Sequence, residues 1–194
     1  MKFTKMHGTG NDYIYVNGFE EKLADPVNAA KIVSDRHFGV GSDGLIIIQP
    51  SDQADCRMEM YNADGSLGMM CGNGIRCVAK YFYDHGMTDR DEITVETLSG
   101  VKQLKLFMKN GKVDTVRVNM GAPILEPAKI PVDLKADRGY LQTTYVKPYG
   151  QILINTDIRV TETLTMKGTC VSMGNPHIVV PVSNVPSFDV DRIG

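Results

Sequence analysis

A cysteine at the predicted start of a helix is the residue best placed to do chemistry in this chain. Cys71 stands in the run Met70-Cys71-Gly72-Asn73-Gly74-Ile75-Arg76-Cys77, directly before an apolar stripe of helical period. Unpaired N–H groups and the positive end of the helix dipole lower the pKa of a thiol at such a position. The same N–H groups bind carboxylates. The segment predicts a site that holds an acid and offers it a base, although an isolated Cys-Gly pair also fits a buried, inert thiol.

A second group of polar residues stands in predicted loops and at element ends. An imidazole titrates near neutral pH, so His177, after Gly174-Asn175-Pro176, could serve as a base beside a thiol. A hydrogen-bonded, partly buried imidazole is the alternative. Asparagine is common in turns for backbone reasons. Together with a cysteine and a histidine, however, four asparagines could line a pocket that binds a zwitterion without adding full charges: Asn11, Asn62, Asn73 and Asn175.

A glycine-rich segment matches a cofactor motif in the wrong context. Gly39-Val40-Gly41-Ser42-Asp43-Gly44 fits G-x-G-x-x-G, but a predicted helix precedes it and an apolar strand follows it. A dinucleotide site needs the reverse order, so we expect a flexible helix-to-strand turn or a glycine-lined edge of a pocket. No nucleophile elbow, phosphate loop or pyridoxal lysine context is present. Cys71 and Cys77 are six residues apart and the histidines are scattered, so we expect neither a metal site nor a cofactor.

Composition narrows the class of protein. The 194 residues are 42% hydrophobic and 23% charged, with a formal net charge of −2, as in an ordinary globular protein. Acids and bases are interspersed without a basic stripe, so we expect no nucleic-acid partner. The aliphatic run Leu45–Ile48 is too short to cross a membrane, and the N-terminus lacks the apolar core of a secretory signal. The four cysteines indicate reduced thiols and a cytoplasmic location.

Two helices are predicted in the first half of the chain. Asp25-Pro26 supplies an N-cap and a first-turn proline for a helix that runs to about Ser34. The second helix follows Cys71, carries the stripe Ile75, Val78, Ala79 and Phe82, and stops near Gly86. Alternating or continuous apolar runs predict strands over 13–16, 45–49, 57–61, 92–97, 101–107 and 113–120, with turns at 62–66 and at Asn110-Gly111.

A proline-rich stretch divides the sequence. Residues 123–131 contain three prolines in nine positions, and we place the boundary between two domains, 1–120 and 121–194, at the start of this stretch. Strand-like pieces follow over 143–146, 151–155, 169–173 and 177–182. No helix-length pattern occurs in this half. The second domain is expected to be incomplete.

Taken together, the motifs resemble those of the diaminopimelate epimerase family. Five blocks in order carry the resemblance: Lys5-Met6-His7-Gly8-Thr9-Gly10-Asn11-Asp12, Arg36 to Gly44, Tyr61-Asn62-Ala63-Asp64-Gly65-Ser66, Met70 to Cys77, and Ser172-Met173-Gly174-Asn175-Pro176-His177. Each block alone is a weak signal. Their order over most of the chain makes the match specific.

The resemblance implies an α/β (α+β) fold of two pseudo-symmetric lobes, each a curled, mostly antiparallel sheet around a central helix. It implies an isomerase without cofactor that converts LL-diaminopimelate to the meso form, for lysine and peptidoglycan biosynthesis, and a homodimer. In this family two cysteines flank the α-carbon of the substrate. By position, Cys71 is one catalytic thiol and His177 tunes it. Gly72 and Asn73 supply N–H groups to a carboxylate, while Asn11, Asn62 and Asn175 line the pocket.

The sequence also departs from the family pattern. The second thiol belongs to an Ala-Cys-Gly-Thr-Gly block that does not occur in these 194 residues, and no other cysteine precedes Gly-Thr-Gly. We therefore expect the chain alone to be inactive or nearly so, either as a fragment or as a part completed by another chain. A non-catalytic amino-acid-binding fragment is the alternative. A second alternative is a related racemase of another amino acid, such as proline or hydroxyproline, with similar fold and cysteine chemistry. These racemases usually carry His in place of Asn73, which argues against them, and Cys71 disfavours the isomerases of phenazine synthesis, which lack this cysteine.

Overall fold

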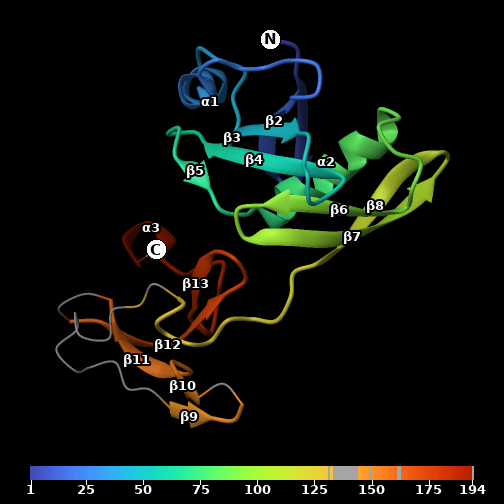
Figure 1. Ribbon diagram of the computed structural model, residues 1–194. Helices are drawn as coiled ribbons and strands as arrows, with labels where there is room; N and C mark the ends of the chain where they lie inside the picture. Colours follow the sequence, from blue (N-terminus) through green and yellow to red (C-terminus); the bar gives the residue numbers. More distant parts are fainter. Residues whose placement is uncertain (131, 133–143, 149, 161–162, 194) are drawn as a thin grey trace. The chain divides into compact units, whose positions relative to one another are not determined.

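The computed structural model describes residues 1–130, 132, 144–148, 150–160 and 163–193 (Figure 1). The chain divides into two compact units, Met1–Met120 and Gly121–Gly194. Pro131, the last of the three boundary prolines, and residue 143 of a predicted strand lie outside the described residues. Among the described residues, no helix has both the length and the apolar character needed to span a bilayer.

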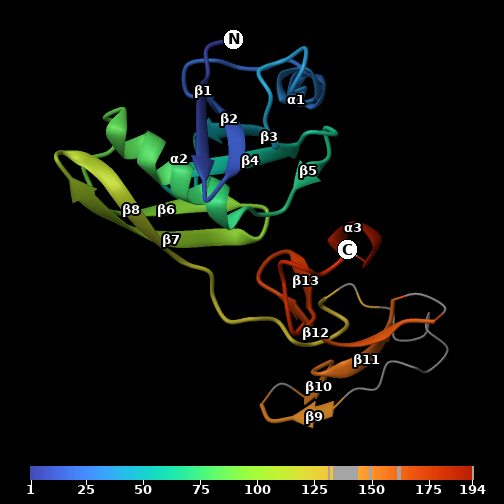
Figure 2. The same ribbon diagram turned by 180° about the vertical axis from the view of Figure 1, so that it is seen from behind.

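The first unit is an eight-stranded sheet that curls around one helix. The sheet has the order β1-β2-β3-β4-β6-β7-β8, with β5 paired to β4, and only the pairs β2–β3 and β4–β6 are parallel. Helix α2 (Gly72–Asp84) contacts both edge strands, β1 and β8, so the sheet must wrap around it (Figure 2). The predicted fold class is confirmed. The strands are Thr4–Gly8, Asn11–Asn17, Gly44–Gln49, Cys56–Asn62, Leu67–Gly68, Glu92–Thr97, Gly100–Lys109 and Lys112–Asn119.

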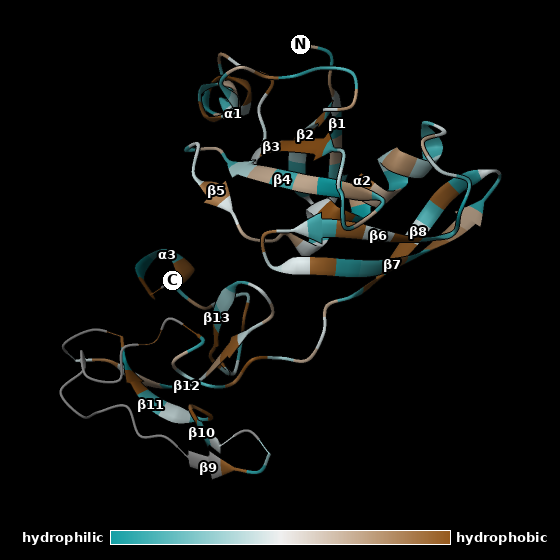
Figure 3. Ribbon diagram, viewed as in Figure 1, coloured by the Kyte–Doolittle hydropathy of each residue, from teal (hydrophilic) through white to brown (hydrophobic). Residues whose placement is uncertain are grey.

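Strands β2 and β3 are buried on both faces. On one face Tyr13, Tyr15 and Ile46 join the core around α2, whereas on the other Ile14 and Leu45 pack under α1 (Pro26–Ser34). A parallel pair covered on both sides needs continuous apolar runs, and β3 is hydrophobic along most of its length (Figure 3). The two strands therefore connect two separate cores.

Both helices of the first unit form where the sequence predicts them. Asp25 caps α1, its carboxylate accepting a hydrogen bond from Asn28 N at 3.0 Å, with Pro26 in the first turn. All four residues of the predicted apolar stripe of α2 are buried. Two residues after its last helical residue, Gly86 has φ +71°, a left-handed conformation that suits glycine at a helix end.

The second unit consists of small antiparallel sheets. A hairpin joins β9 (Thr144–Val146) to β10 (Gly150–Ile152), and β12 (Thr165–Ser172) lies between β11 (Thr156–Arg159) and β13 (Pro176–Val179). Its described core contains Ile130, Leu153 and Cys170. The one-turn helix α3 (Val190–Ile193) and several strand ends differ from the prediction, because short, mostly exposed elements leave a weak apolar pattern.

The glycine-rich segment between α1 and β3 is close-packed rather than loose. The N–H groups of residues 40 and 41 donate to Val33 O and that of Ser42 to Ser34 O, so the segment satisfies carbonyls at the C-terminus of α1. A Cβ on Gly39 would stand 2.1 Å from Ile32 O, and one on Gly44 the same distance from Tyr61 O. Side chains are therefore excluded at both positions by backbone contact.

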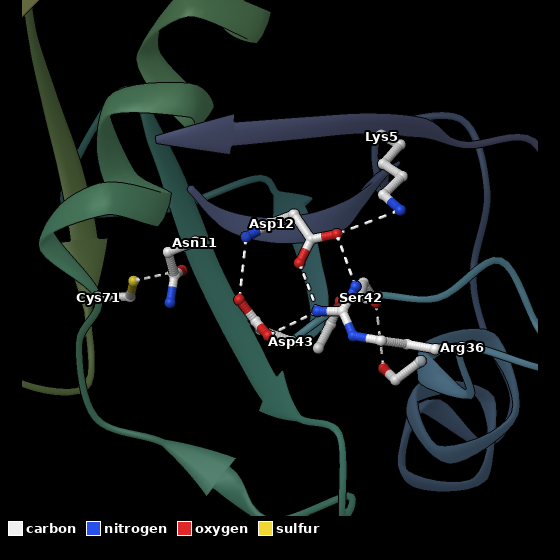
Figure 4. A network of polar contacts seen from close by, with 9 residues as sticks. Lys5, Asn11, Asp12, Arg36, Ser42, Asp43 and Cys71 are labelled. Carbon is white, nitrogen blue, oxygen red and sulfur yellow. Dashed lines mark hydrogen bonds and ion pairs between the residues drawn. The ribbon is translucent and has the colours of Figure 1, made fainter. Parts of the chain in front are cut away.

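An ion-pair network ties this segment to the hairpin of β1 and β2 (Figure 4). Arg36 donates to Asp12 Oδ1 at 2.8 Å and to Asp43 Oδ1 at 2.9 Å, and Lys5 lies 3.1 Å from Asp12 Oδ2. The backbone repeats the link, since Asp43 N donates to Asp12 O and Asp43 Oδ2 accepts from Asp12 N. The hydrogen bonds from Arg36, with that from Lys5, hold the pKa of Asp12 well below its ordinary value of 3.8.

We predict that Asp12→Asn lowers the free energy of unfolding by about 1–2 kcal/mol at neutral pH, because the Asp12 side chain is only 15% exposed although Arg36 is 55% exposed. The lowered pKa means that the carboxylate stabilises the fold above its ordinary pKa and loses this effect as the pH falls below it. The free energies of unfolding of the variant and of the unaltered chain should therefore differ less at about pH 3 than at about pH 7. Urea unfolding followed by circular dichroism measures both.

Asp91→Asn is the matched control, since Asp91 pairs with Lys105 while 51% exposed. It should change the free energy of unfolding by less than about 0.5 kcal/mol. An equal loss for both variants, or a loss for Asp12→Asn that does not depend on pH, would contradict the role given to the network.

Candidate active site

Cys71 is the N-cap residue of α2. Its backbone is extended (φ −131°, ψ 111°), and its Sγ accepts a hydrogen bond from Gly74 N at 3.2 Å. The half-buried thiol also lies 3.7 Å from Asn11 Oδ1, to which it donates (Figure 4). The sulfur therefore sits at the positive end of the helix, as the sequence predicts, and a thiolate there would receive a backbone N–H.

Two tyrosines lie beneath this sulfur, and the sequence analysis assigned them no role. Burial raises the pKa of Tyr13, and the neighbouring Cys71 raises it further. Burial also raises the pKa of Tyr15, whose hydroxyl donates to Gly74 O at 3.4 Å. Both phenols stay protonated at neutral pH, so neither adds a negative charge beside the sulfur. The signal in the sequence was the spacing of Asn11, Tyr13 and Tyr15, which places them on one face of a strand.

Asn11 reaches Cys71 because of a tight turn. Gly8 pairs with Asn11, and the two residues between them, Thr9 and Gly10, have φ of +56° and +87°. Two residues at positive φ form the hairpin turn that matches the twist of its strands. A Cβ on Gly8 would stand 3.0 Å from Asn73 O, so the absence of a side chain lets the hairpin approach the start of α2.

Gly72 and Asn73 form the first turn of α2, beside this hairpin. The Oδ1 of Asn73 accepts a hydrogen bond from Arg76 at 2.6 Å. No acidic side chain occurs in the first turn. The N–H groups at this end therefore face a site without a neighbouring carboxylate on the same turn, which suits an incoming anion.

The remaining predicted residues are not brought to Cys71 by any described contact. Asn62 ends β4, and its Nδ2 donates to Ser66 Oγ at 2.9 Å within the turn that follows. Asn175 and His177 belong to the second unit, in the turn before β13 and in β13 itself, and both are exposed. Their approach to the thiol stays a prediction.

The other three cysteines are poorly placed for acid–base chemistry. Burial raises the pKa of Cys56 to about 12, and it also raises the pKa of Cys77 and of Cys170. All three are free thiols with less than a tenth of their surface exposed. Within the described part of the chain, no three side chains of His, Cys, Asp or Glu gather into a group able to hold a metal ion.

The geometry supports acid binding beside a single accessible thiol. Backbone donors, an electropositive helix end and the sulfur lie together, while the protonated Tyr13 phenol and the Asn11 amide adjoin the sulfur. Such a site can hold a carboxylate and exchange a proton at the carbon next to it.

Comparison with known proteins agrees with this geometry. A protein in Agathobacter rectalis named diaminopimelate epimerase is 56% identical over the whole chain, which covers 65% of that protein. One of the same name in Acetivibrio thermocellus is 52% identical, with 64% of it covered. The chain thus spans less than two thirds of the length of these curated relatives.

Solved structures show the same fold at low sequence identity. A hydroxyproline epimerase from Agrobacterium vitis matches 92% of this chain and 50% of its own with a TM-score of 0.58 at 14% identity. A PhzF-family phenazine biosynthesis protein from Bacillus anthracis matches 96% of this chain and 58% of its own with the same TM-score at 18% identity. The family model for diaminopimelate epimerase matches residues 3–126. The chain belongs to the diaminopimelate epimerase family.

Proposed function

We propose that this protein is an isomerase that epimerises LL-diaminopimelate to meso-diaminopimelate without a cofactor, with Cys71 as one of two proton-transfer groups. The observation that carries the proposal is the sulfur at the N-cap of α2, hydrogen-bonded by Gly74 N and flanked by Asn11. The names of the curated relatives supply the substrate. The structural likeness to the hydroxyproline epimerase is too distant in sequence to favour proline over diaminopimelate.

The chemistry demands strong stabilisation of negative charge. The hydrogen on the α-carbon of an amino acid is very weakly acidic, so a base alone does not suffice. In the proposal, the substrate carboxylate lies against the N–H groups of Gly72 and Asn73, which meet the charge that develops as the proton leaves. One well-placed donor of this kind lowers the barrier by roughly 3 kcal/mol.

Inversion requires a second group on the opposite face of the α-carbon. The family resemblance implies a second cysteine for that task, and the raised pKa and the burial of Cys56, Cys77 and Cys170 argue against each of them. We therefore expect these 194 residues alone to exchange the α-hydrogen slowly and to form little meso product. His177 and Asn175 are proposed to complete the site, His177 as the residue that tunes Cys71.

The proposal also concerns location and assembly. A role in lysine and peptidoglycan biosynthesis and four free cysteines favour the reducing cytoplasm. The family resemblance favours a homodimer. Nucleic acid and membrane have no part in this function.

The first test follows hydrogen exchange. In heavy water, LL-diaminopimelate incubated with the protein should gain deuterium at an α-carbon, detected by mass spectrometry. Cys71→Ala should slow the exchange by about a thousandfold, because a positioned general base contributes about 10²- to 10⁴-fold. Cys77→Ala, which alters a buried thiol on the same helix, should retain the exchange.

Binding gives a second measurement where exchange is slow. LL-diaminopimelate should protect Cys71 from alkylation by iodoacetamide. Exchange that survives in Cys71→Ala would contradict the proposal, as would an unaltered chain that shows neither exchange nor protection. Protection without any exchange would favour the alternative of a non-catalytic binding fragment.

A further prediction concerns the four thiols themselves. Cys71 should be alkylated about tenfold faster than the others at neutral pH, because the other three thiols are almost fully buried and burial raises their pKa, which lowers both their access to the reagent and their thiolate fraction. Peptide mapping after brief treatment with iodoacetamide measures the four rates. Faster labelling of Cys56 or Cys77 than of Cys71 would show that the site assignment is wrong.

A further inference from the structure

The first turns of α2 contain a cation where a helix dipole favours an anion. Negative side chains stabilise the N-terminus of a helix, and positive ones stabilise its C-terminus. Helix α2 has no acidic residue in its first turn and no basic residue in its last. Arg76, four residues after Gly72, instead places its guanidinium at the N-terminal end. This arrangement opposes the helix dipole, and the contacts of Arg76 show what it provides at the site.

The Arg76 guanidinium holds the end of the helix together. It donates to Gly72 O at 2.9 Å, to Asn73 Oδ1 at 2.6 Å and to Thr9 Oγ1 at 3.3 Å. These are three oxygens on two segments far apart in the sequence. The planar fork of an arginine can satisfy several acceptors at once, which a lysine ammonium does less well.

The contact with Asn73 decides which way its amide points. A guanidinium has donors only, so the atom of Asn73 that it binds must be the carbonyl oxygen. The NH₂ group of the amide is then the end left to face a ligand, and it can only donate. A hydrogen-bond donor at this position can bind a carboxylate, which only accepts hydrogen bonds, but it cannot bind an ammonium group, which only donates them.

The charge of Arg76 is also not neutralised by a nearby acid. Arg36 is paired with Asp12 and Asp43, and Arg90 with Asp55. Arg76 forms no ion pair with any residue that the structure describes. Its positive charge therefore adds to the field of the helix end.

We propose that Arg76 is a positioning residue of the active site: it orients Asn73 as a donor toward the substrate carboxylate and adds its positive charge to the helix end beside Cys71. This inference rests on the proposed function in one respect only, which is that the bound carboxylate belongs to LL-diaminopimelate. Through Thr9, Arg76 also fixes the turn that places Asn11 against the sulfur. One side chain thus couples the two segments that surround the thiol.

The test compares two alkylating reagents of different charge on the full chain. Iodoacetate is anionic and iodoacetamide neutral, so the ratio of their rates at Cys71 measures the local potential. Arg76→Gln should lower this ratio by about three- to tenfold, since the loss of a nearby unit charge raises the energy of an anionic reagent at the site and so slows its reaction by about this factor. Circular dichroism checks that the variant is folded.

Two further variants separate charge from position. Lys80→Gln removes a unit charge one turn further along α2, where Lys80 pairs with Asp84, and should leave the ratio nearly unchanged. Arg76→Lys keeps the charge and should keep the ratio of alkylation rates. LL-diaminopimelate should nevertheless protect Cys71 about tenfold less well, because the hydrogen bond to Asn73 Oδ1 is lost.

The outcomes are distinct. An unchanged rate ratio in folded Arg76→Gln would overturn the proposal, as would an equal effect of Lys80→Gln. A structural role alone would lower stability without changing the rate ratio. If the unaltered chain neither exchanges the α-hydrogen of LL-diaminopimelate nor is protected by it, the proposed function fails, while the rate ratio still decides whether Arg76 controls the potential at Cys71.

Discussion

The start of α2 is the constraint on which the first unit depends. The helix is buried along a whole face inside the curled sheet, yet the proposed function requires its N-terminal N–H groups and the Cys71 sulfur to remain available to a small molecule. Burial of Ile75 and Val78 anchors the helix, and the approach of Gly8 fixes its first turn. Donors held in this way do not have to be ordered when a ligand arrives, which is the condition for strong stabilisation of developing charge.

The strands beneath the helix serve two cores at once. Because β2 alternates between the core around α2 and the core under α1, the face that carries Asn11 and Tyr13 is backed by a second apolar layer. The ion pairs of Arg36 tie the same strand to the segment that follows α1. The position of the polar groups around the sulfur is thus set by packing against α2 and α1 and by the ion pairs of the segment that follows α1.

Local sequence patterns predicted most helices and strands of the first unit, whereas the contacts between distant segments could not be predicted from them. The cap at Asp25, the stripe of α2 and the strand over 92–97 follow from spacing alone, and the structure confirms them. The two-residue strand β5 is too short to give a pattern. Arg36 and Asp12 form a pair although 24 positions separate them in the sequence. Arg76 and Thr9, which are hydrogen-bonded, are 67 positions apart. No local sequence pattern reveals contacts of this length. The glycine segment was expected to be a flexible turn, but whether a glycine gives freedom or close packing depends on the neighbour it meets, here Ile32 O.

The two-residue turn at Thr9 and Gly10 limits how this protein can vary. Side chains alternate along a strand, so one inserted or deleted residue in the turn would send Asn11 and Tyr13 toward α1 and bring Ile14 under the sulfur. The change would exchange the polar surroundings of the thiol for aliphatic ones and leave two polar groups in an apolar layer. Loop length is usually the most tolerant property of a fold, but here the count of residues between Gly8 and Asn11 is as restrictive as the identity of any side chain.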